Sequence, residues 1–193
     1  DVSAGLRVAD SGGSDQSYTT MKYIKHETAI QFTDVTLAAG LDHKHSPVKE
    51  KFTNAENGLM AGGAVAEDFD GDGWVDLFVL TGDSSAALLY MNQKNGTFQD
   101  EAFERGAALT SNSGMAAAAA DYDNDGDIDI FVSNDFPPHD LLVNQGDGSF
   151  APGEVPLMQP SAFATSPSWG DVDNDGLLEL VLGEWNPIPR FRG

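Results

Sequence analysis

Short apolar runs bounded by clusters of Asp, Asn and Gly recur along the chain. Three of them, at 77–80, 130–132 and 180–182, come directly after an acidic segment. Small or apolar residues precede the acidic segments, as at 64–66 and 116–120. Runs of about four β-prone residues with turn-forming flanks are typical of buried strands. The pattern therefore predicts a protein built from short β-strands.

The acidic segments are copies of one unit, which we call acidic loops 1, 2 and 3. They occupy residues 68–76, 121–129 and 171–179, so their starts lie 53 and 50 residues apart (121 − 68 and 171 − 121). Later parts repeat too, because Leu-Leu-Tyr-Met-Asn at 88–92 matches Leu-Leu-Val-Asn at 141–144. A repeat of about 50 residues with several short strands is the size of a β-propeller blade. The sequence predicts an all-β, propeller-like array of four-stranded blades, partial or completed by another chain.

The strands of the first blade are expected near 64–67, 77–80, 88–92 and 97–100. The Asn95-Gly96 and Asp147-Gly148 pairs suit tight hairpin turns, which need a positive φ. The alanine run at 116–120 is also a good helix former. Because the same slot in the other repeats holds Gly-Ala-Val-Ala and Pro-Ser-Trp-Gly, a strand is the better prediction.

The repeat divides the chain into segments: a tail at 1–17, N-terminal strands and a loop at 18–60, blades with loops 1 and 2 at 61–116 and 117–165, and a partial blade with loop 3 at 166–193. Tyr18–Thr36 resembles the last two strands of a blade, because Phe32-Thr-Asp34 matches Phe98-Gln-Asp100. The strands suffice for only three blades, whereas closed propellers usually have about four to eight. Open sheet edges invite pairing, so we expect head-to-tail self-association into a ring or filament. The alternative is a fragment of a longer propeller.

The charge of the chain narrows its partners. Acidic side chains number 31 against 10 basic ones, a net charge of −21. Nucleic acid needs clustered Lys and Arg, so neither it nor an anionic membrane is expected, and cations are. No apolar run approaches the roughly 18 residues of a membrane span. The residues at Asp1 do not form the basic segment and apolar stretch of a signal peptide, so none is expected within this sequence. The absence of cysteine excludes disulfides and thiolate zinc sites.

The acidic loops carry the candidate chemistry. With the first Asp as position 1, carboxylates fall at positions 1, 3, 5 and 9, and Gly73, Gly126 or Gly176 stands at position 6. Side chains at alternate positions of a sharply turning loop converge, and glycine permits the turn. Carboxylates this close repel one another without a cation. Calcium accepts about six to eight oxygen ligands, and the carbonyl at position 7 with water completes such a shell. The alternative is three solvated acidic turns.

Two other cation sites share part of this pattern. An EF-hand loop begins D-x-D-x-D-G, but its bidentate Glu is at position 12 and helices flank it. Position 12 here is Val79, Val132 or Leu182, each inside an apolar run, so the EF-hand interpretation fails. Magnesium prefers a stricter octahedron and keeps more water, so four converging carboxylates favour calcium, though not exclusively.

The loop D-x-D-x-D-G-x-x-[DE] before an apolar strand resembles the calcium loops of integrin α-subunit β-propellers and FG-GAP/VCBS-type repeats. The match extends to their secreted, cartilage-acidic-protein-like branch, in which phrases similar to Phe32-Thr-Asp-Val-Thr36 and Met60-Ala-Gly-Gly63 precede the acidic loop. The resemblance covers roughly residues 19–192. It implies a secreted or cell-surface module for adhesion or structure, without enzymatic activity. Its expected partners are calcium, a second copy, another extracellular protein or a glycan.

By this resemblance each loop binds one Ca²⁺, giving three sites, through its four carboxylates and the carbonyl at position 7. The carboxylates are those of Asp68, Asp70, Asp72 and Asp76; Asp121, Asp123, Asp125 and Asp129; and Asp171, Asp173, Asp175 and Glu179. The carbonyls are those of Trp74, Asp127 and Leu177. Glu179 departs from the usual Asp, and its longer side chain changes the third site.

Other polar and aromatic residues suggest weaker candidates. His43 and His45 form a possible transition-metal pair, although exposed imidazoles are usually only solvated. Asn95-Gly-Thr97 is a glycosylation acceptor sequence as well as a turn. A glycan-binding or glycan-processing domain is the alternative function, with Glu184 as a spare carboxylate and three tryptophans that stack on sugars or pack between blades: Trp74, Trp169 and Trp185. Hydrolysis would need a carboxylate pair about 5–9.5 Å apart in a cleft.

Overall fold

The computed structural model describes residues 32–43, 62–82, 86–110, 114–134, 138–155 and 164–184. The chain divides into two compact units, Asp1–Asp34 and Val35–Gly193. All described strands lie in the second unit. The predicted tail, most of the segment 18–60, His45 and Trp185 lie outside the described residues.

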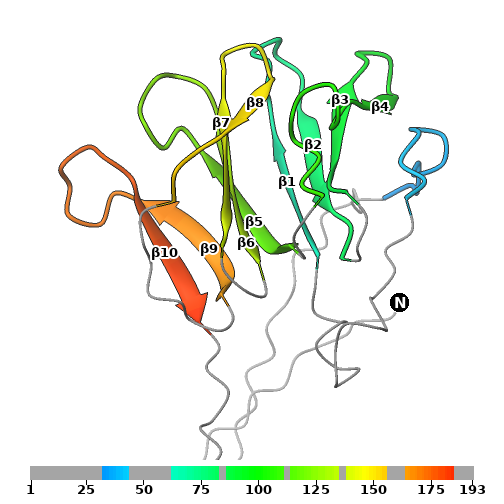
Figure 1. Cartoon of the computed structure of the whole chain (residues 1–193). Coiled ribbons are helices and arrows are strands. Elements are labelled where there is room, and N and C mark those ends of the chain that lie inside the picture. Colours follow the sequence, from blue (N-terminus) through cyan, green and yellow to red (C-terminus); the bar gives the residue numbers. More distant parts are fainter. Residues whose placement is uncertain are drawn as a thin grey trace, which may run out of the picture. The chain divides into compact units, whose positions relative to one another are not determined.

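The described residues form three antiparallel sheets and no helix (Figure 1). Sheet A contains β1 (Gly63–Glu67), β2 (Asp76–Leu80), β3 (Leu88–Asn92) and β4 (Phe98–Asp100), in that order. Sheet B repeats this order with β5 (Gly114–Ala120), β6 (Asp129–Asn134), β7 (Asp140–Asn144) and β8 (Phe150–Pro152). Sheet C pairs β9 (Ala164–Gly170) with β10 (Glu179–Glu184). The all-β prediction of four-stranded, propeller-like blades is confirmed.

The alanine run is a strand, as predicted, because it lies in β5 and pairs along its length with β6. The first strands of sheets B and C begin before the predicted segments 117–165 and 166–193. β5 starts at Gly114, which pairs with Asn134, and β9 starts at Ala164, which pairs with Glu184. The added residues lie beyond the repeated motif, so only their backbone pairing reveals them.

The core lies between successive sheets. The first strands β1, β5 and β9 lie side by side, and the sheets fan out from them (Figure 1). Sheet A contributes Phe78, Leu80, Leu89 and Met91 to a buried cluster that sheet B completes with Ile130, Val132 and Leu142. The other face of β6 presents Phe131, whose ring meets that of Trp169 at 6.3 Å between centroids. Every residue of β6 is therefore buried, whereas buried and half-buried residues alternate in β2.

A tight turn after β4 ties sheet A to sheet B. In residues 101–107, Arg105 N–H donates to the Glu101 carbonyl at 2.9 Å, and Ala107 N–H donates to the Ala102 carbonyl at 2.8 Å. The Arg105 carbonyl then accepts a hydrogen bond from Phe150 N–H, which begins β8. This turn thereby docks the end of sheet A on the outer strand of sheet B.

Residues 35–41 form the same turn on sheet A. Ala39 N–H donates to the Val35 carbonyl at 2.8 Å, and Leu41 N–H donates to the Thr36 carbonyl at 2.9 Å. The Ala39 carbonyl accepts from Phe98 N–H at 2.9 Å, just as the carbonyl of the later turn accepts from β8. The sequence match of 32–34 to 98–100 thus extends into an equivalent hydrogen-bonded turn.

The strand predicted within Tyr18–Thr36 needs correction where it is described. Residues 32–35 carry no strand, and the Phe32 side chain is 94% exposed. A strand requires backbone partners in a neighbouring strand. The segment predicted to supply them, before Phe32, lies outside the described residues.

We predict that Gly106→Ala destabilises the fold more than Gly96→Ala. Both glycines have positive φ, +75° and +88°, which costs a non-glycine residue roughly 1–2 kcal/mol. A Cβ at Gly106 would also overlap the Phe150 carbonyl oxygen and separate the docked turn from β8, whereas a Cβ at Gly96 meets nothing within 4 Å. Urea unfolding should show an additional loss of about 1 kcal/mol or more for Gly106→Ala. Equal losses would contradict the docking role of the turn.

Candidate metal centre

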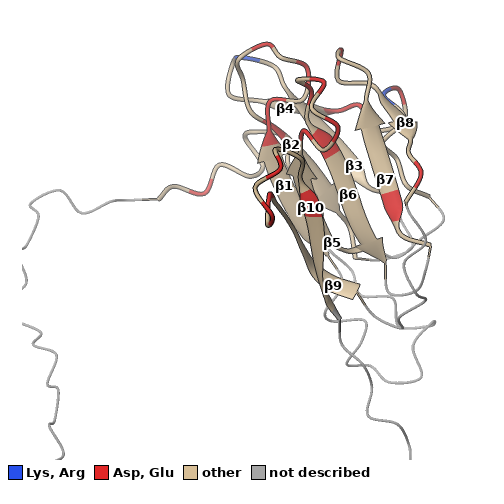
Figure 2. Ribbon diagram, turned by 90° about the vertical axis from the view of Figure 1, so that its left-hand side faces the viewer, with Lys and Arg blue, Asp and Glu red and all other residues tan. Residues whose placement is uncertain are grey.

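Each acidic loop joins the first strand of a sheet to the second. The loops therefore lie at the same end of their sheets, where acidic residues gather in the coloured ribbon (Figure 2). Lys94 and Arg105 are the cationic Lys and Arg side chains of the described residues, and both contact loop 1. Within the described ranges no Lys or Arg contacts loops 2 and 3, so their carboxylate charge is in excess there.

The loops share one hydrogen-bonded frame. The carboxylate at position 1 accepts from the backbone N–H groups of positions 5 and 6, as Asp121 does from Asp125 and Gly126 at 3.0 Å each. The N–H of position 7 donates to the carboxylate at position 5, at 2.8–3.0 Å in all three loops. This frame curls the backbone around its own carboxylates.

The backbone is left-handed at two positions of each loop. Position 6 is the predicted glycine, with φ between 87° and 99°. Position 4 is also left-handed, with φ of 69° at Gly71 and 61° at Asn124 and Asn174. Glycine and asparagine tolerate this conformation best. Sequence reasoning overlooked position 4, although its restriction to Gly and Asn was the signal.

Three carboxylates converge in each loop. The groups are Asp68, Asp70 and Asp76; Asp121, Asp123 and Asp129; and Asp171, Asp173 and Glu179. In each group one ligand atom per residue lies within 4.8 Å of the others. The structure thus brings together positions 1, 3 and 9 of the predicted set. Position 5 does not belong to these groups, and the carbonyl ligands at position 7 stay predictions.

The carboxylate at position 9 is the most buried member of loops 1 and 2. Asp76 is 2% exposed and Asp129 is 1% exposed. Asp129 accepts hydrogen bonds from Asn144 N–H at 2.8 Å and Tyr122 N–H at 3.2 Å, and Asp76 accepts equivalent bonds. Burial nevertheless raises the pKa of both carboxyl groups, that of Asp129 to about 6. Burial without a cation therefore disfavours their ionised forms.

The surroundings of the Asp70 carboxylate indicate whether loop 1 fits a cation. Its Oδ1 atom is buried and has no hydrogen-bond partner. Desolvation, followed by the Asp72 carboxylate, raises its pKa, while the Arg105 guanidinium opposes the shift. A buried acceptor without a partner is costly. The oxygen-only donor set and this unpaired atom fit a hard divalent cation.

Loops 1 and 3 depart from this pattern in opposite ways. In loop 1 the position-5 carboxylate of Asp72 pairs with Lys94 at 2.7 Å, which lowers its pKa, and Arg105 lies 3.8 Å from Asp70. In loop 3 residues 171–177 are all exposed. The longer Glu179 still accepts from Val172 N–H at 2.8 Å, so it reaches the same place as the aspartates.

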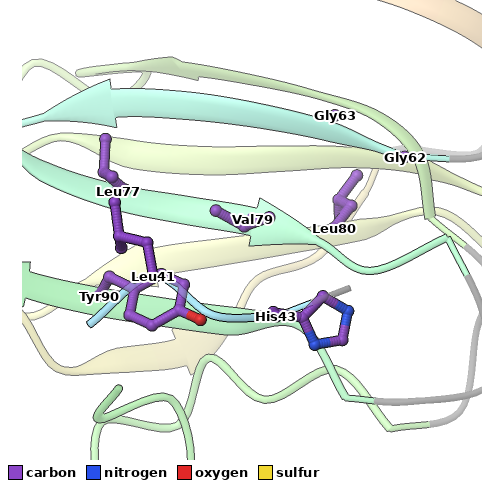
Figure 3. Close-up of a pocket in the computed structure, with 8 residues that line it drawn as sticks. All are labelled: Leu41, His43, Gly62, Gly63, Leu77, Val79, Leu80 and Tyr90. Atoms are coloured by element: carbon purple, nitrogen blue, oxygen red, sulfur yellow. The ribbon is translucent and has the colours of Figure 1, made fainter. Parts of the chain in front are cut away.

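A separate apolar pocket of about 440 Å³ lies on sheet A (Figure 3). Its lining includes Leu41, His43, Leu77 and Tyr90 but no carboxylate. A second pocket of about 510 Å³ contains one carboxylate, that of Asp140. Neither offers the pair of carboxylates that glycoside hydrolysis needs.

The other sequence candidates are placed differently. Trp169 packs between sheets B and C against Phe131, with Tyr122 6.1 Å away, while Trp74 is 48% exposed. Asn95 is exposed, and its Oδ1 accepts from Thr97 N–H at 2.9 Å within the hairpin turn. In the described part of the chain, no helix is long and apolar enough to cross a membrane.

Comparison with known families matches the FG-GAP-like repeat twice, at residues 68–132 and 121–182. These matches start at the first residues of loops 1 and 2 and together span more than half of the chain. The chain belongs to the FG-GAP-like repeat family. Among curated proteins it is similar to cartilage acidic protein 1 of Mus musculus, with 34% identity over 102 residues. The match covers 49% of this chain and 15% of the relative's length.

We predict that the metal-free FG-GAP-like module becomes more stable as pH falls from about 7 to about 4. The folded pKa of Asp129 is about 6, above the roughly 3.9 of an unfolded Asp. Its stabilising contribution is therefore complete below the unfolded pKa and lost as pH rises through the folded value. Chemical unfolding in chelator should show this gain in stability at low pH, and Asp129→Asn should reduce the gain by an amount on the order of 2 kcal/mol. A pH profile unchanged by Asp129→Asn would contradict the buried carboxylate.

Proposed function

We propose that this FG-GAP-like module is a calcium-stabilised extracellular structural or adhesion module. The observation that carries the proposal is the convergence of three carboxylates in each of three loops, with ligand atoms within 4.8 Å. Such grouping is electrostatically unfavourable unless a cation is bound. The unpaired buried Oδ1 of Asp70 supports a cation in loop 1.

The residues that would hold calcium are the converging carboxylates at positions 1, 3 and 9. The other ligands predicted from the sequence, the carboxylate at position 5 and the carbonyl at position 7, would join them after local rearrangement, with water filling the rest of the shell. In loop 1 this requires Asp72 to leave Lys94. Bound calcium would supply two positive charges that offset part of the carboxylate charge of each loop. Magnesium is less suited, because its strict octahedron retains more water.

An extracellular location and a non-catalytic role are part of the proposal. Their support is the similarity to a protein named for cartilage and for its acidity, over about half of this chain. The two pockets described above add support, since neither contains a pair of carboxylates. The alternative remains a glycan-binding module, for which Trp74 offers an exposed indole ring. A glycan array in calcium distinguishes the two.

We also propose self-association through β10. Both β2 and β6 pair with a third strand, whereas β10 pairs with β9 alone among the described residues. Val181 on β10 is 52% exposed. An open edge with exposed apolar residues favours strand addition. Size-exclusion chromatography with light scattering in calcium should show a discrete oligomer or a polymer, and a well-folded monomer would refute this part of the proposal.

We predict that calcium removal lowers the melting temperature. Extracellular modules bind calcium with dissociation constants of about 10⁻⁴–10⁻³ M. At about 1 mM calcium each site then adds about 0.4–1.4 kcal/mol, so three sites add roughly 1–4 kcal/mol. Differential scanning calorimetry with and without excess chelator measures the change.

Two substitutions sharpen this experiment. Asp123→Ala should remove one site, reduce the calorimetric binding stoichiometry by one and diminish the stabilisation by calcium. Glu104→Gln removes an exposed carboxylate outside the acidic loops and should change neither quantity. A melting curve that does not respond to chelator in the wild-type protein would refute calcium as a folding ligand.

A further inference from the structure

Asn144 lies between acidic loops 1 and 2. It is 2% exposed and ends β7 in sheet B. Its backbone N–H donates to Asp129 of loop 2 at 2.8 Å. Its side-chain Nδ2 donates at 2.7 Å to the carbonyl of Phe69 in loop 1, which belongs to the neighbouring sheet. One residue therefore contacts the backbone of one loop and a carboxylate of the other.

The connection continues to a carboxylate of loop 1. The residue that accepts the Asn144 bond, Phe69, donates its own N–H to Asp76 at 3.2 Å. Three hydrogen bonds, linked through the backbone of Phe69 and through the side chain and backbone of Asn144, thus join Asp76 to Asp129. Both ends are the buried position-9 carboxylates of their groups.

The turn that follows Asn144 is fixed against loop 1. The Asn144 Oδ1 atom accepts from the N–H groups of Gly146 and Gly148 at 3.1 and 3.2 Å. Gly148 is packed so closely that an added Cβ would lie 2.9 Å from the Cβ of Asp70. Arg105 donates to the Asp147 carbonyl at 2.8 Å while its guanidinium lies 3.8 Å from Asp70. Loop 1 and the turn therefore have little freedom to move separately.

We propose that Asn144 couples the two loops, so that cation binding in one raises the affinity of the other. This inference rests on the proposed calcium function. A cation that fixes loop 1 also fixes the Phe69 carbonyl, and with it the Asn144 side chain and the N–H that holds Asp129. Part of the conformational entropy that loop 2 loses on ordering is then already lost before its own cation binds. By linkage the effect is reciprocal.

Asn92 provides an internal comparison. It occupies the equivalent place in sheet A, and its N–H donates to Asp76 at 2.7 Å. Its Nδ2 reaches the Val75 carbonyl at 3.0 Å, as that of Asn144 reaches Ile128 at 3.1 Å. The described bonds of Asn92 stay within sheet A. The feature that distinguishes Asn144 is therefore its bond to the neighbouring loop.

The test measures calcium binding by calorimetry in a parent that carries Asp173→Asn, so that loop 3 does not contribute. Asp70→Asn and Asp123→Asn then disable loops 1 and 2 singly. In each of these variants one site remains. That site should bind calcium at least about fivefold more weakly than it does in the parent when the other loop holds calcium. Asn144→Ala should reduce this ratio towards one, whereas the matched variant Asn92→Ala should preserve it.

The outcomes separate this inference from the proposed function. Calcium binding with equal dissociation constants in the parent and the single-loop variants would overturn the coupling and leave the calcium function standing. Absence of binding in the parent would overturn both. If Asn144→Ala does not fold, as judged by circular dichroism, the parent and single-loop variants still decide whether coupling exists, and Arg105→Gln then tests the contact between the loop and the turn. Retention of the ratio in a folded Asn144→Ala variant would overturn the role of Asn144.

Discussion

Repulsion between carboxylates held within 4.8 Å of one another constrains each acidic loop. The chain opposes it first with backbone N–H groups, which surround the carboxylates at positions 1, 5 and 9. These bonds do not fully compensate burial, because the pKa of Asp76 and that of Asp129 stay raised. At loop 1, Lys94 and Arg105 add positive charge. The loops therefore combine a preformed backbone with an unbalanced charge, an arrangement that a cation can complete.

Packing between the sheets determines how each loop is supported. Phe69 lies in loop 1, is 2% exposed and packs edge-on against Phe150 of sheet B, with ring centroids 5.7 Å apart. Loop 1 is thus anchored in the apolar core as well as by its polar frame. Loop 3 has exposed Val172 at the equivalent position. The same motif therefore lies in different environments, because each loop depends on the sheet that follows it.

Much of the fold was predictable because the repeat combines two local signals. Apolar runs identified the strands, and Asn95-Gly96 identified a turn; β3 was predicted at its observed bounds. The limits of β5 and β9 were less accessible, because Gly114 and Ala164 join their strands only through pairing partners distant in sequence. The acidic positions of the site were equally readable. The separation of position 5 from positions 1, 3 and 9 was not, because it depends on three-dimensional loop geometry.

The segments that hold a loop or sheet in place belong to a different sequence repeat from that loop or sheet. A sequence repeat runs from one acidic loop to the next, yet the surroundings of loop 1 include the turn after β7, from the following sheet. The turn at 35–41 shows the same arrangement at the other side of sheet A, since it docks on β4 as 101–107 docks on β8. Sheets A and B are thus held by segments that precede or follow them in sequence. Such interlocking makes adjacent repeats interdependent, and a substitution in one loop can alter the support of the next.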